Sequence, residues 1–343
     1  MENDSRRLPV YLLLDTSESM AGPAIEAVAQ GVSTLVKELR TNPLALETAY
    51  LSVITFSRDA QQLVPLSELL HFQPPPLRVR PGTALGAALR MLIECLQRDV
   101  KKTTPTTKGD YKPLVFILTD GQPTDSWEQA ADAVKQAGRP KMANVFAIGC
   151  GPDVDTDVLY RITDTVLVMP NLTPEAIRKS FVWLSASVQT VSTKVEGISE
   201  KESLNLPTPP ADALQGAPRT TGPRDQTPRQ VFLHALCSKN RQPYLMRFVR
   251  RSYEHQYDAV AAHRLEVLEE GDAASIPPIS ASLLHGIPDC PYCENASGTV
   301  CPRCRAIFCE PLETPPETTC PKCGAYLVKG GDGSAPDIKI TPG

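Results

Sequence analysis

Short apolar runs alternate with amphipathic segments along the first 190 residues of the chain. Runs of this kind are typical of buried strands, and they fall at residues 9–14, 51–56, 112–119 and 144–148. Apolar residues recur at helical spacing in the segments that follow Gly22-Pro23, Thr83 and Thr173-Pro174. Asp125 and Glu128 have the spacing of a capping box and predict a further helix through Val134. This alternation predicts an α/β fold, doubly wound, with a mostly parallel sheet covered on both faces.

The pattern changes after residue 190. Residues 191–229 are rich in proline and lack aromatic side chains, so they cannot bury enough apolar surface to offset the entropy of ordering. Residues 231–236 and 244–249 flank a polar stretch and predict a β-hairpin, which residues 264–270 could extend. The predicted organisation is therefore an α/β domain at 1–190, a flexible linker at 191–229, a small β-rich domain at 230–330 and a disordered tail at 331–343.

Charge and composition exclude several classes of protein. The chain has 35 Lys and Arg residues against 39 Asp and Glu residues, which argues against a strongly basic nucleic-acid arm or an acidic tail. No run approaches the length of a transmembrane helix, and residues 1–7 lack the apolar region of a secretory signal. Because the cysteines also come as CxxC pairs, metal binding in a reducing compartment is favoured over disulfides, and a cytoplasmic protein is predicted.

Oxygen-bearing side chains gather where the predicted strands end. Asp15, Ser17 and Ser19 follow the first strand, Thr83 opens a helix, and Asp120 follows the strand at 112–119. The carboxyl ends of parallel strands share one edge of a sheet, so these residues are expected to converge. Two carboxylates and three hydroxyls suit Mg²⁺ or Mn²⁺, and an ion held by so few charged ligands keeps a position open for an acidic group from outside.

At these residues the sequence resembles the von Willebrand factor A domain family and its metal-ion-dependent adhesion site. The resemblance covers about 190 residues and implies that the five residues named above form the coordinating set. Glu18 departs from the small residue that the family commonly has between the two serines. A carboxylate at that position is expected to crowd the site or to add negative charge.

Within that family, the stretches RRLPVYLLLDTS, PAIEAV, ALETAYLSVITF and LGAAL are most similar to TerY-type proteins of bacterial tellurite-resistance clusters. Those clusters pair such proteins with a protein kinase and a PP2C-type phosphatase. The resemblance implies a cytoplasmic adaptor in stress or phosphorylation signalling, with a Ser/Thr kinase and a PP2C-type phosphatase as partners.

Seven of the ten cysteines lie close together near the end of the chain, at positions Cys290, Cys293, Cys301, Cys304, Cys309, Cys320 and Cys323. Three CPxC turns among them each direct two thiolates at one ion, and Zn²⁺ takes four such ligands. The spacing between Cys301/Cys304 and Cys320/Cys323 is that of a single zinc site. A second zinc would use the other three cysteines with His285 as a possible fourth ligand. The alternative pairing of Cys290/Cys293 with Cys320/Cys323 remains open, and His285 is equally an ordinary loop histidine.

This region also resembles the C-terminal metal-binding domain of longer TerY-like proteins, and its zinc sites are expected to be structural. Three cysteines remain outside the cluster. Cys95, Cys150 and Cys237 lie in or next to apolar segments and are interpreted as small buried residues.

The sequence favours a binding protein over an enzyme. It contains no P-loop, HExxH, GxSxG or kinase signature. The leading hypothesis is an adaptor in which the divalent ion captures an Asp or Glu of a partner while the zinc module supplies a second surface. The alternative is nucleic-acid binding through the zinc-ribbon-like domain and its basic and aromatic hairpin, formed by Lys239, Arg241, Tyr244, Arg247, Phe248, Arg250, Arg251 and Tyr253.

Overall fold

A computed structural model describes most of the chain, namely residues 6–120, 122–136, 143–151, 154–194, 206–218, 230–251, 256–267, 279–311, 317–328, 337–338 and 341–342. The chain divides into two units. The first comprises Met1–Arg78 and Thr83–Pro223, and the second comprises Val79–Gly82 and Arg224–Gly343. Each unit has hydrophobic clusters of its own.

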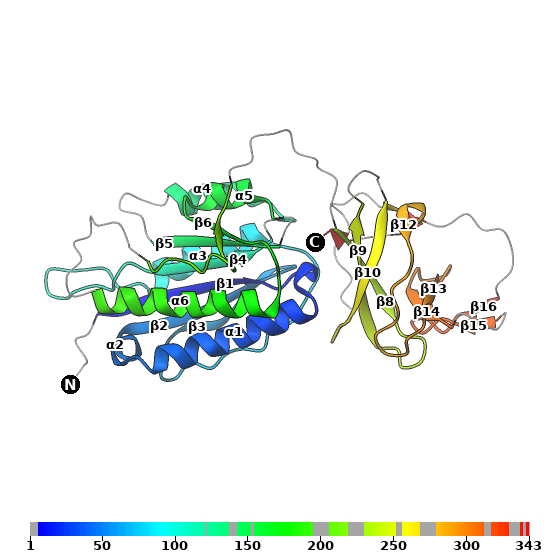
Figure 1. Ribbon diagram of the computed structural model, residues 1–343, viewed down its shortest axis with the longest axis horizontal. Helices are drawn as coiled ribbons and strands as arrows, with labels where there is room; N and C mark the ends of the chain where they lie inside the picture. Colours follow the sequence, from blue (N-terminus) through cyan, green and yellow to red (C-terminus); the bar gives the residue numbers. More distant parts are fainter. Residues whose placement is uncertain are drawn as a thin grey trace. The chain divides into compact units, whose positions relative to one another are not determined.

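A mostly parallel sheet forms the centre of the first unit, as the apolar runs predict (Figure 1). Its strands follow the order β3-β2-β1-β4-β5-β6-β7. The edge strands β3 and β7 are antiparallel to their neighbours, and the remaining pairs are parallel. The strands span Leu8–Asp15 (β1), Ala49–Phe56 (β2), Ala60–Glu68 (β3), Leu114–Thr119 (β4), Asn144–Cys150 (β5), Val166–Met169 (β6) and Gln215–Gly216 (β7).

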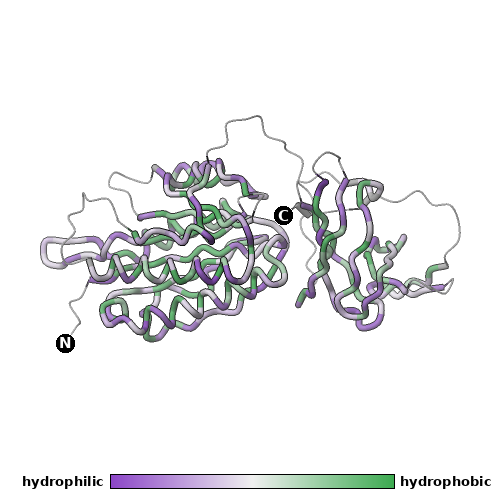
Figure 2. The backbone as a smooth tube through the Cα atoms, viewed as in Figure 1, coloured by the Kyte–Doolittle hydropathy of each residue, from purple (hydrophilic) through white to green (hydrophobic). Residues whose placement is uncertain are grey.

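Helices cover both faces of this sheet because successive side chains of a strand point to opposite faces. In β1, Leu12 and Leu14 pack in the cluster that contains α1 and α6, while Tyr11 and Leu13 pack in the cluster that contains α3, α4 and α5. All eight residues of β1 are buried, and Figure 2 shows the central strands as hydrophobic segments. The helices span Pro23–Arg40 (α1), Pro43–Thr48 (α2), Leu85–Asp99 (α3), Glu128–Gln136 (α4), Thr156–Ile162 (α5) and Pro174–Lys194 (α6).

The role of Asp125 differs from the sequence prediction. Its two carboxylate oxygens accept hydrogen bonds from the amides of Gly86 and Ala87, at 2.9 and 2.8 Å, in the first turn of α3. Asp125 therefore caps α3, which is distant in sequence, and the capping box predicted for α4 is wrong.

Part of the predicted linker is ordered against the first unit. Residues 195–205 and 219–229 lie outside the described residues, but residues 206–218 contact α5, α6 and β6. Ala213 and Leu214 are each 1% exposed, and Trp183 donates a hydrogen bond of 2.8 Å to the carbonyl of Pro207. Two buried apolar side chains and the short strand β7 thus anchor a segment whose composition alone predicts disorder.

A second sheet organises the second unit, with the strand order β12-β10-β9-β8-β14-β13 and β18 paired to β8. The hairpin of β8 and β9 confirms the prediction from residues 231–249. Tyr244, Phe248 and Tyr257 fill the main apolar cluster of this unit. The strands span Gln230–Leu236 (β8), Pro243–Arg250 (β9), Tyr257–Arg264 (β10), Leu284–His285 (β12), Ser297–Val300 (β13), Ile307–Glu310 (β14) and Thr341–Pro342 (β18).

Short strand pairs complete the second unit. Ile279–Ser280 (β11) pairs with Asp337–Ile338 (β17), and Glu317–Thr319 (β15) pairs with Tyr326–Val328 (β16). The strands β17 and β18 belong to the predicted disordered tail, so four of its residues pair with earlier strands, and its other residues are outside the described ranges. None of the helices in the described part of the chain combines the length and the apolar character that crossing a membrane requires.

Candidate metal centres

Asp15 is the last residue of β1, and both of its carboxylate oxygens accept hydrogen bonds. The Ser17 amide donates to Oδ1 at 2.9 Å, and the Thr119 hydroxyl donates to Oδ2 at 2.6 Å. The hydroxyls of Ser17 and Ser19 are 2.9 Å apart. Asp15, Ser17 and Ser19 are at most 6% exposed. Three of the five predicted ligands therefore form one buried oxygen cluster at the end of the strand.

Thr83 reaches the same edge of the sheet from the loop before α3. The Ala84 amide donates to the Ser57 carbonyl at 2.6 Å, which ties this loop to the residue that follows β2. The Thr83 side chain is fully buried, and its Oγ1 atom has no hydrogen-bond partner among the described residues. A buried hydroxyl without a partner is costly, and a bound cation would supply the missing interaction.

Asp120 follows β4 and acts on Asp15 through its charge. Burial and then the negative charge of Asp120 raise the pKa of Asp15 to about 7, against the opposing effect of hydrogen bonds from Ser17 and Thr119. Burial, followed by the charges of Asp15 and Asp120, also raises the pKa of the Cys150 thiol well above its usual value. A divalent cation between the two carboxylates would compensate these charges.

The candidate cation site (Asp15, Ser17, Ser19, Thr83 and Asp120) therefore fits Mg²⁺ or Mn²⁺. Its donors are hard oxygens, one of them lacks a protein partner, and its carboxylates are held close together without a basic residue in the donor set. Glu18 lies in the short helix Glu18–Met20 and is 1% exposed, so its carboxylate is buried and does not extend into solvent.

Two groups of four cysteines occupy the second unit. The inner sulfur cluster contains Cys237, Cys290, Cys293 and Cys309, and the outer sulfur cluster contains Cys301, Cys304, Cys320 and Cys323. Within each cluster the sulfur atoms all lie within 4.8 Å of one another. The outer cluster is the set that the CxxC spacing predicts, and the alternative pairing of Cys290/Cys293 with Cys320/Cys323 is excluded by this arrangement.

The sulfur distances match tetrahedral zinc coordination. With Zn–S bonds of about 2.3 Å, the sulfurs of a regular tetrahedron lie about 3.8 Å apart. The measured separations are 3.5 Å between Cys293 and Cys309, 3.7 Å between Cys301 and Cys323, and 3.6 Å between Cys304 and Cys320. Each cluster therefore brings four sulfur atoms close enough together to hold one zinc ion.

Hydrogen bonds also favour the thiolate form that binds metal. Burial opposes ionisation of Cys309, but the hydroxyl and amide of Ser238 donate to its sulfur and lower the pKa below its usual value. Burial likewise opposes ionisation of Cys301, and the amides of Cys304 and Arg303 lower its pKa to about 7. Each cluster therefore contains a cysteine whose surroundings stabilise the charged ligand.

Four turns of one geometry carry most of these ligands. In each turn the amide of the first cysteine donates to the carbonyl five residues later, and its carbonyl accepts from the amide four residues later. The residue four positions after the cysteine has positive φ in every case, between 60° and 70°. These turns begin at Cys237, Cys290, Cys301 and Cys320.

Cys237 belongs to the inner sulfur cluster, which corrects its interpretation from the sequence as no more than a small buried residue. Its turn has the hydrogen bonds of the other three, but Asn240 occupies the position where they have a second cysteine. The Asn240 side chain accepts from the Gln242 amide at 3.0 Å, and Cys309 supplies the remaining sulfur. The missing second cysteine removes the CxxC signal, although the polar turn after an apolar strand was visible in the sequence.

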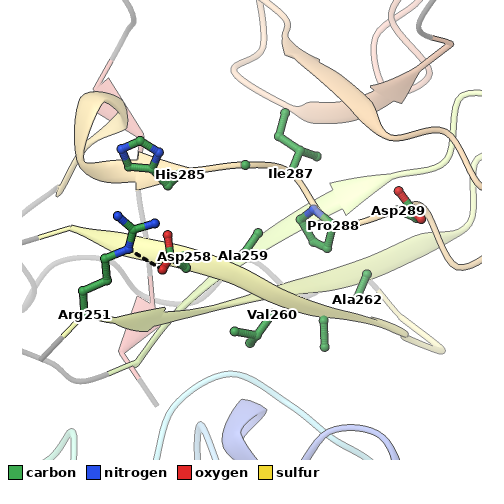
Figure 3. A pocket seen from close by; sticks show the side chains of 11 residues that line it. Arg251, Asp258, Ala259, Val260, Ala262, His285, Ile287, Pro288 and Asp289 are labelled. Carbon is green, nitrogen blue, oxygen red and sulfur yellow. Dashed lines mark hydrogen bonds and ion pairs between the residues drawn. The ribbon is translucent and has the colours of Figure 1, made fainter.

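His285 is not the fourth ligand, because Cys237 completes the inner sulfur cluster. Figure 3 shows His285 on β12, lining a cleft of about 680 Å³ together with β10 and residues 286–289. Beside it, Arg251 donates a hydrogen bond of 2.5 Å to Asp258. His285 is thus outside both sulfur clusters, as the non-ligand interpretation expects, but it lies on a short strand instead of in a loop.

Two of the three aromatic side chains of the predicted nucleic-acid surface are buried and not available for base stacking. Tyr244 and Phe248 are each 1% exposed and belong to the apolar cluster of the second unit. Arg251 is engaged with Asp258, and Tyr253 lies outside the described residues. The structure therefore leaves that alternative without two of the three aromatic side chains that it invoked.

Comparison with known proteins identifies the fold of the first unit. Residues 10–169 match the family model of the von Willebrand factor type A domain. No curated protein matches the sequence. Solved structures with similarity include the conserved hypothetical protein BatB from Bacteroides thetaiotaomicron, at 19% identity, with 53% of this chain and 98% of that chain covered and a TM-score of 0.37.

Two further similar structures come from other organisms. The ArnB paralog VWA2 from Sulfolobus acidocaldarius is 17% identical, covers 54% of this chain and 46% of its own, and has a TM-score of 0.39. A von Willebrand factor type A protein from Catenulispora acidiphila is 14% identical, covers 76% of this chain and 66% of its own, and has a TM-score of 0.40. The family match and the sheet described above agree on the architecture. Residues 10–169, the greater part of the first unit, therefore form a von Willebrand factor type A domain.

Proposed function

We propose that this chain is a protein-interaction adaptor whose first unit captures a partner through a bound divalent cation. A von Willebrand factor type A domain suggests an interaction role, and the candidate cation site supports dependence on a metal. The observation that carries the proposal is the Thr83 hydroxyl, which is fully buried and has no hydrogen-bond partner in the described part of the chain, at the sheet edge that also carries the buried carboxylates of Asp15 and Asp120. A cation accounts for both features at once.

The chemistry of the donor set favours capture over catalysis. Asp15, Asp120 and the three hydroxyls include no histidine or lysine that would act as a base or clamp a phosphate. An ion held by two carboxylates retains positive character, and the carboxylate of an Asp or Glu from a partner would fill its open position. We therefore propose a non-enzymatic role. A Ser/Thr kinase and a PP2C-type phosphatase, which the resemblance to proteins of tellurite-resistance clusters implies, are the partners to test first.

The second unit is proposed to be a structural zinc module. Two Cys₄ sets, each with all its sulfur atoms within 4.8 Å of one another, support one Zn²⁺ in each cluster, and closed Cys₄ sites stabilise folds. Thiolate ligands persist where thiols stay reduced, which supports a cytoplasmic location. In this proposal the zinc module supplies a second binding surface, and two linked surfaces raise the overall affinity for a partner that engages both.

Metal titration of the full chain tests the proposal directly. The zinc-loaded protein, treated to remove other divalent ions, is titrated with Mg²⁺ and Mn²⁺ by calorimetry. We expect one site per chain, lost in Asp15→Ala. Capture of the kinase or the phosphatase on immobilised protein is expected to require Mg²⁺ and to fail in Asp15→Ala. Partner binding that persists both in EDTA and in Asp15→Ala contradicts the metal-bridged mechanism.

A further inference from the structure

The loops that carry Thr83 and Asp120 are joined by two reciprocal hydrogen bonds between Thr83 and Thr124. The Thr83 amide donates to Thr124 Oγ1 at 2.9 Å, and the Thr124 amide donates to the Thr83 carbonyl at 2.9 Å. Thr124 lies in the loop after β4, four residues beyond Asp120. Two hydrogen bonds of this kind fix the separation and the relative orientation of the two loops.

Asp125 strengthens the same connection from the next position. Its two oxygens accept from the amides of Gly86 and Ala87, and the guanidinium of Arg90 lies 3.4 Å from Oδ2. Arg90 also donates to the Ser126 carbonyl at 2.9 Å. The amides that Asp125 caps belong to the first turn of α3, so the loop after β4 is anchored to the helix that Thr83 precedes.

Gly86 allows the two segments to approach this closely. A Cβ atom at Gly86 would lie 2.2 Å from the backbone oxygen of Ser126, a distance that no side chain tolerates. The close approach therefore depends on glycine at the start of α3. The sequence resemblance did not assign Thr124, Asp125 or Gly86 to the site.

We infer that Thr124 and Asp125 are positioning residues that hold Thr83 and Asp120 at the separation a small cation requires, and that they thereby determine the preference of the site for Mg²⁺ over Ca²⁺. This inference rests on the proposed function. Neither residue belongs to the candidate cation site; the Thr124 hydroxyl and both Asp125 oxygens accept hydrogen bonds from backbone amides of the Thr83 loop and α3.

The different sizes of Mg²⁺ and Ca²⁺ explain why the spacing of the two ligand loops affects which ion the site prefers. Mg²⁺ requires near-octahedral oxygens at about 2.0–2.1 Å, whereas Ca²⁺ accepts irregular shells at about 2.3–2.6 Å. A rigid connection between the ligand loops favours the smaller ion, and a loosened connection removes that advantage. Loss of the connection is therefore expected to weaken Mg²⁺ binding more than Ca²⁺ binding.

The test compares Thr124→Val and Asp125→Asn with two controls on the full, zinc-loaded chain. Thr124→Ser keeps the acceptor oxygen. Thr163→Val removes a hydroxyl with matched bonding elsewhere in the same domain, since Thr163 Oγ1 donates to the Val145 carbonyl at 2.7 Å and accepts from the Thr165 amide at 3.2 Å. Mg²⁺ and Ca²⁺ affinities are measured by calorimetry, and amide exchange at Thr83, Gly86 and Ala87 is measured without Mg²⁺ or Ca²⁺.

We expect Thr124→Val and Asp125→Asn to lose about tenfold in Mg²⁺ affinity, in the range known for partners that orient metal ligands. The loss for Ca²⁺ should be smaller, and the three amides should exchange faster. Thr124→Ser and Thr163→Val should bind both ions as the wild type does. Equal losses for Mg²⁺ and Ca²⁺, or a Mg²⁺ affinity that matches Thr163→Val, would overturn the inference. Unchanged Mg²⁺ binding in Asp15→Ala would instead overturn the cation site itself.

Discussion

Thr119 Oγ1 donates a hydrogen bond of 2.6 Å to Asp15 Oδ2 and joins the ends of the neighbouring parallel strands β1 and β4. The Ser17 amide occupies the other carboxylate oxygen at 2.9 Å. Both donors are neutral, so they orient the Asp15 carboxylate without compensating its charge. Burial and the charge of Asp120 outweigh these bonds and raise the pKa of Asp15 to about 7.

The free energy of unfolding of the Mg²⁺-free protein should therefore fall as pH rises toward neutrality. The pKa of Asp15 is about 7 in the folded chain against a model value of 3.8, so the folded state keeps a proton that the unfolded state releases between these values. Each pH unit in this window costs at most about 1.4 kcal/mol. Above pH 7 Asp15 is ionised in both the folded and the unfolded state, so its effect on the free energy of unfolding no longer changes with pH.

Urea unfolding followed by tryptophan fluorescence measures this loss, because Trp127 and Trp183 both lie in the first unit. Asp15→Asn is the control, since its amide does not titrate. Saturating Mg²⁺ should restore the stability lost near pH 7. Parallel curves for wild type and Asp15→Asn across this window would show that Asp15 is charged throughout it.

Thr83→Val is expected to stabilise the Mg²⁺-free protein while weakening its metal binding. The substitution keeps the shape of the side chain and removes a fully buried hydroxyl oxygen that has no partner among the described residues. Leaving such a group unpaired costs about 1–3 kcal/mol, so a gain of about 1 kcal/mol is expected in urea unfolding. Mg²⁺ affinity should fall at least tenfold, because a ligand is lost. Thr163→Val removes a hydroxyl that is hydrogen-bonded and should therefore lower the free energy of unfolding. Equal losses of unfolding free energy in Thr83→Val and Thr163→Val would contradict the assignment of Thr83 Oγ1 as a buried oxygen without a partner among the described residues.

The parts of the fold that the sequence predicted are those with strong local signals. The strands β1, β2, β4 and β5 are short continuous apolar runs, and they are buried on both faces. The edge strand β3 was missed because it alternates half-buried and exposed residues and contains Pro65. The segment at 206–218 was assigned to a linker because only tertiary contacts, such as that of Trp183 with Pro207, reveal that it is anchored.

For the candidate sites too, the sequence predicted the residues with strong local signals and missed those brought in by long-range contacts. The oxygen ligands lie at strand ends whose convergence follows from parallel topology, and the CxxC pairs identify the outer sulfur cluster directly. Cys237 lies far from the other ligands in sequence and has no second cysteine in its turn, so only the pairing of β8 with β14 brings it to Cys309. Capping of α3 by Asp125 depends on a similar long-range contact.

Cys237→Ser should remove one of two zinc ions and destabilise the second unit. Cys237 follows β8 and is the ligand that links the first hairpin to the CxxC region, so its loss leaves three thiolates in the inner sulfur cluster. Elemental analysis after mild chelation should give two zinc ions per wild-type chain and one per variant chain. Cys95→Ser, at a buried cysteine in α3 of the first unit, is the control and should retain two. Two ions in Cys237→Ser would exclude Cys237 as an essential ligand.

The outer sulfur cluster should release its zinc before the inner cluster does. Cys237, Cys290 and Cys309 are at most 1% exposed and belong to the main apolar cluster of the second unit, which shields the inner cluster from chelators. In the outer cluster, Cys323 is the most accessible of the eight ligands, and the surrounding apolar cluster is smaller. Ligand exchange begins at an accessible thiolate, so a chromogenic chelator should record a fast and a slow phase of equal amplitude.

Two variants assign these phases. Cys323→Ser should abolish or accelerate only the fast phase, and Cys293→Ser, at the partly exposed ligand of the inner cluster, should affect only the slow phase. The slow phase should also coincide with loss of the β8–β9 hairpin, because Cys237 directly follows β8 and its amide donates to the Gln242 carbonyl before β9 begins. A single phase, or a fast phase that disappears in Cys293→Ser, would show that the two clusters release zinc together or in the opposite order. In the expected order, an oxidant or chelator strips the outer site while the inner site keeps the sheet folded.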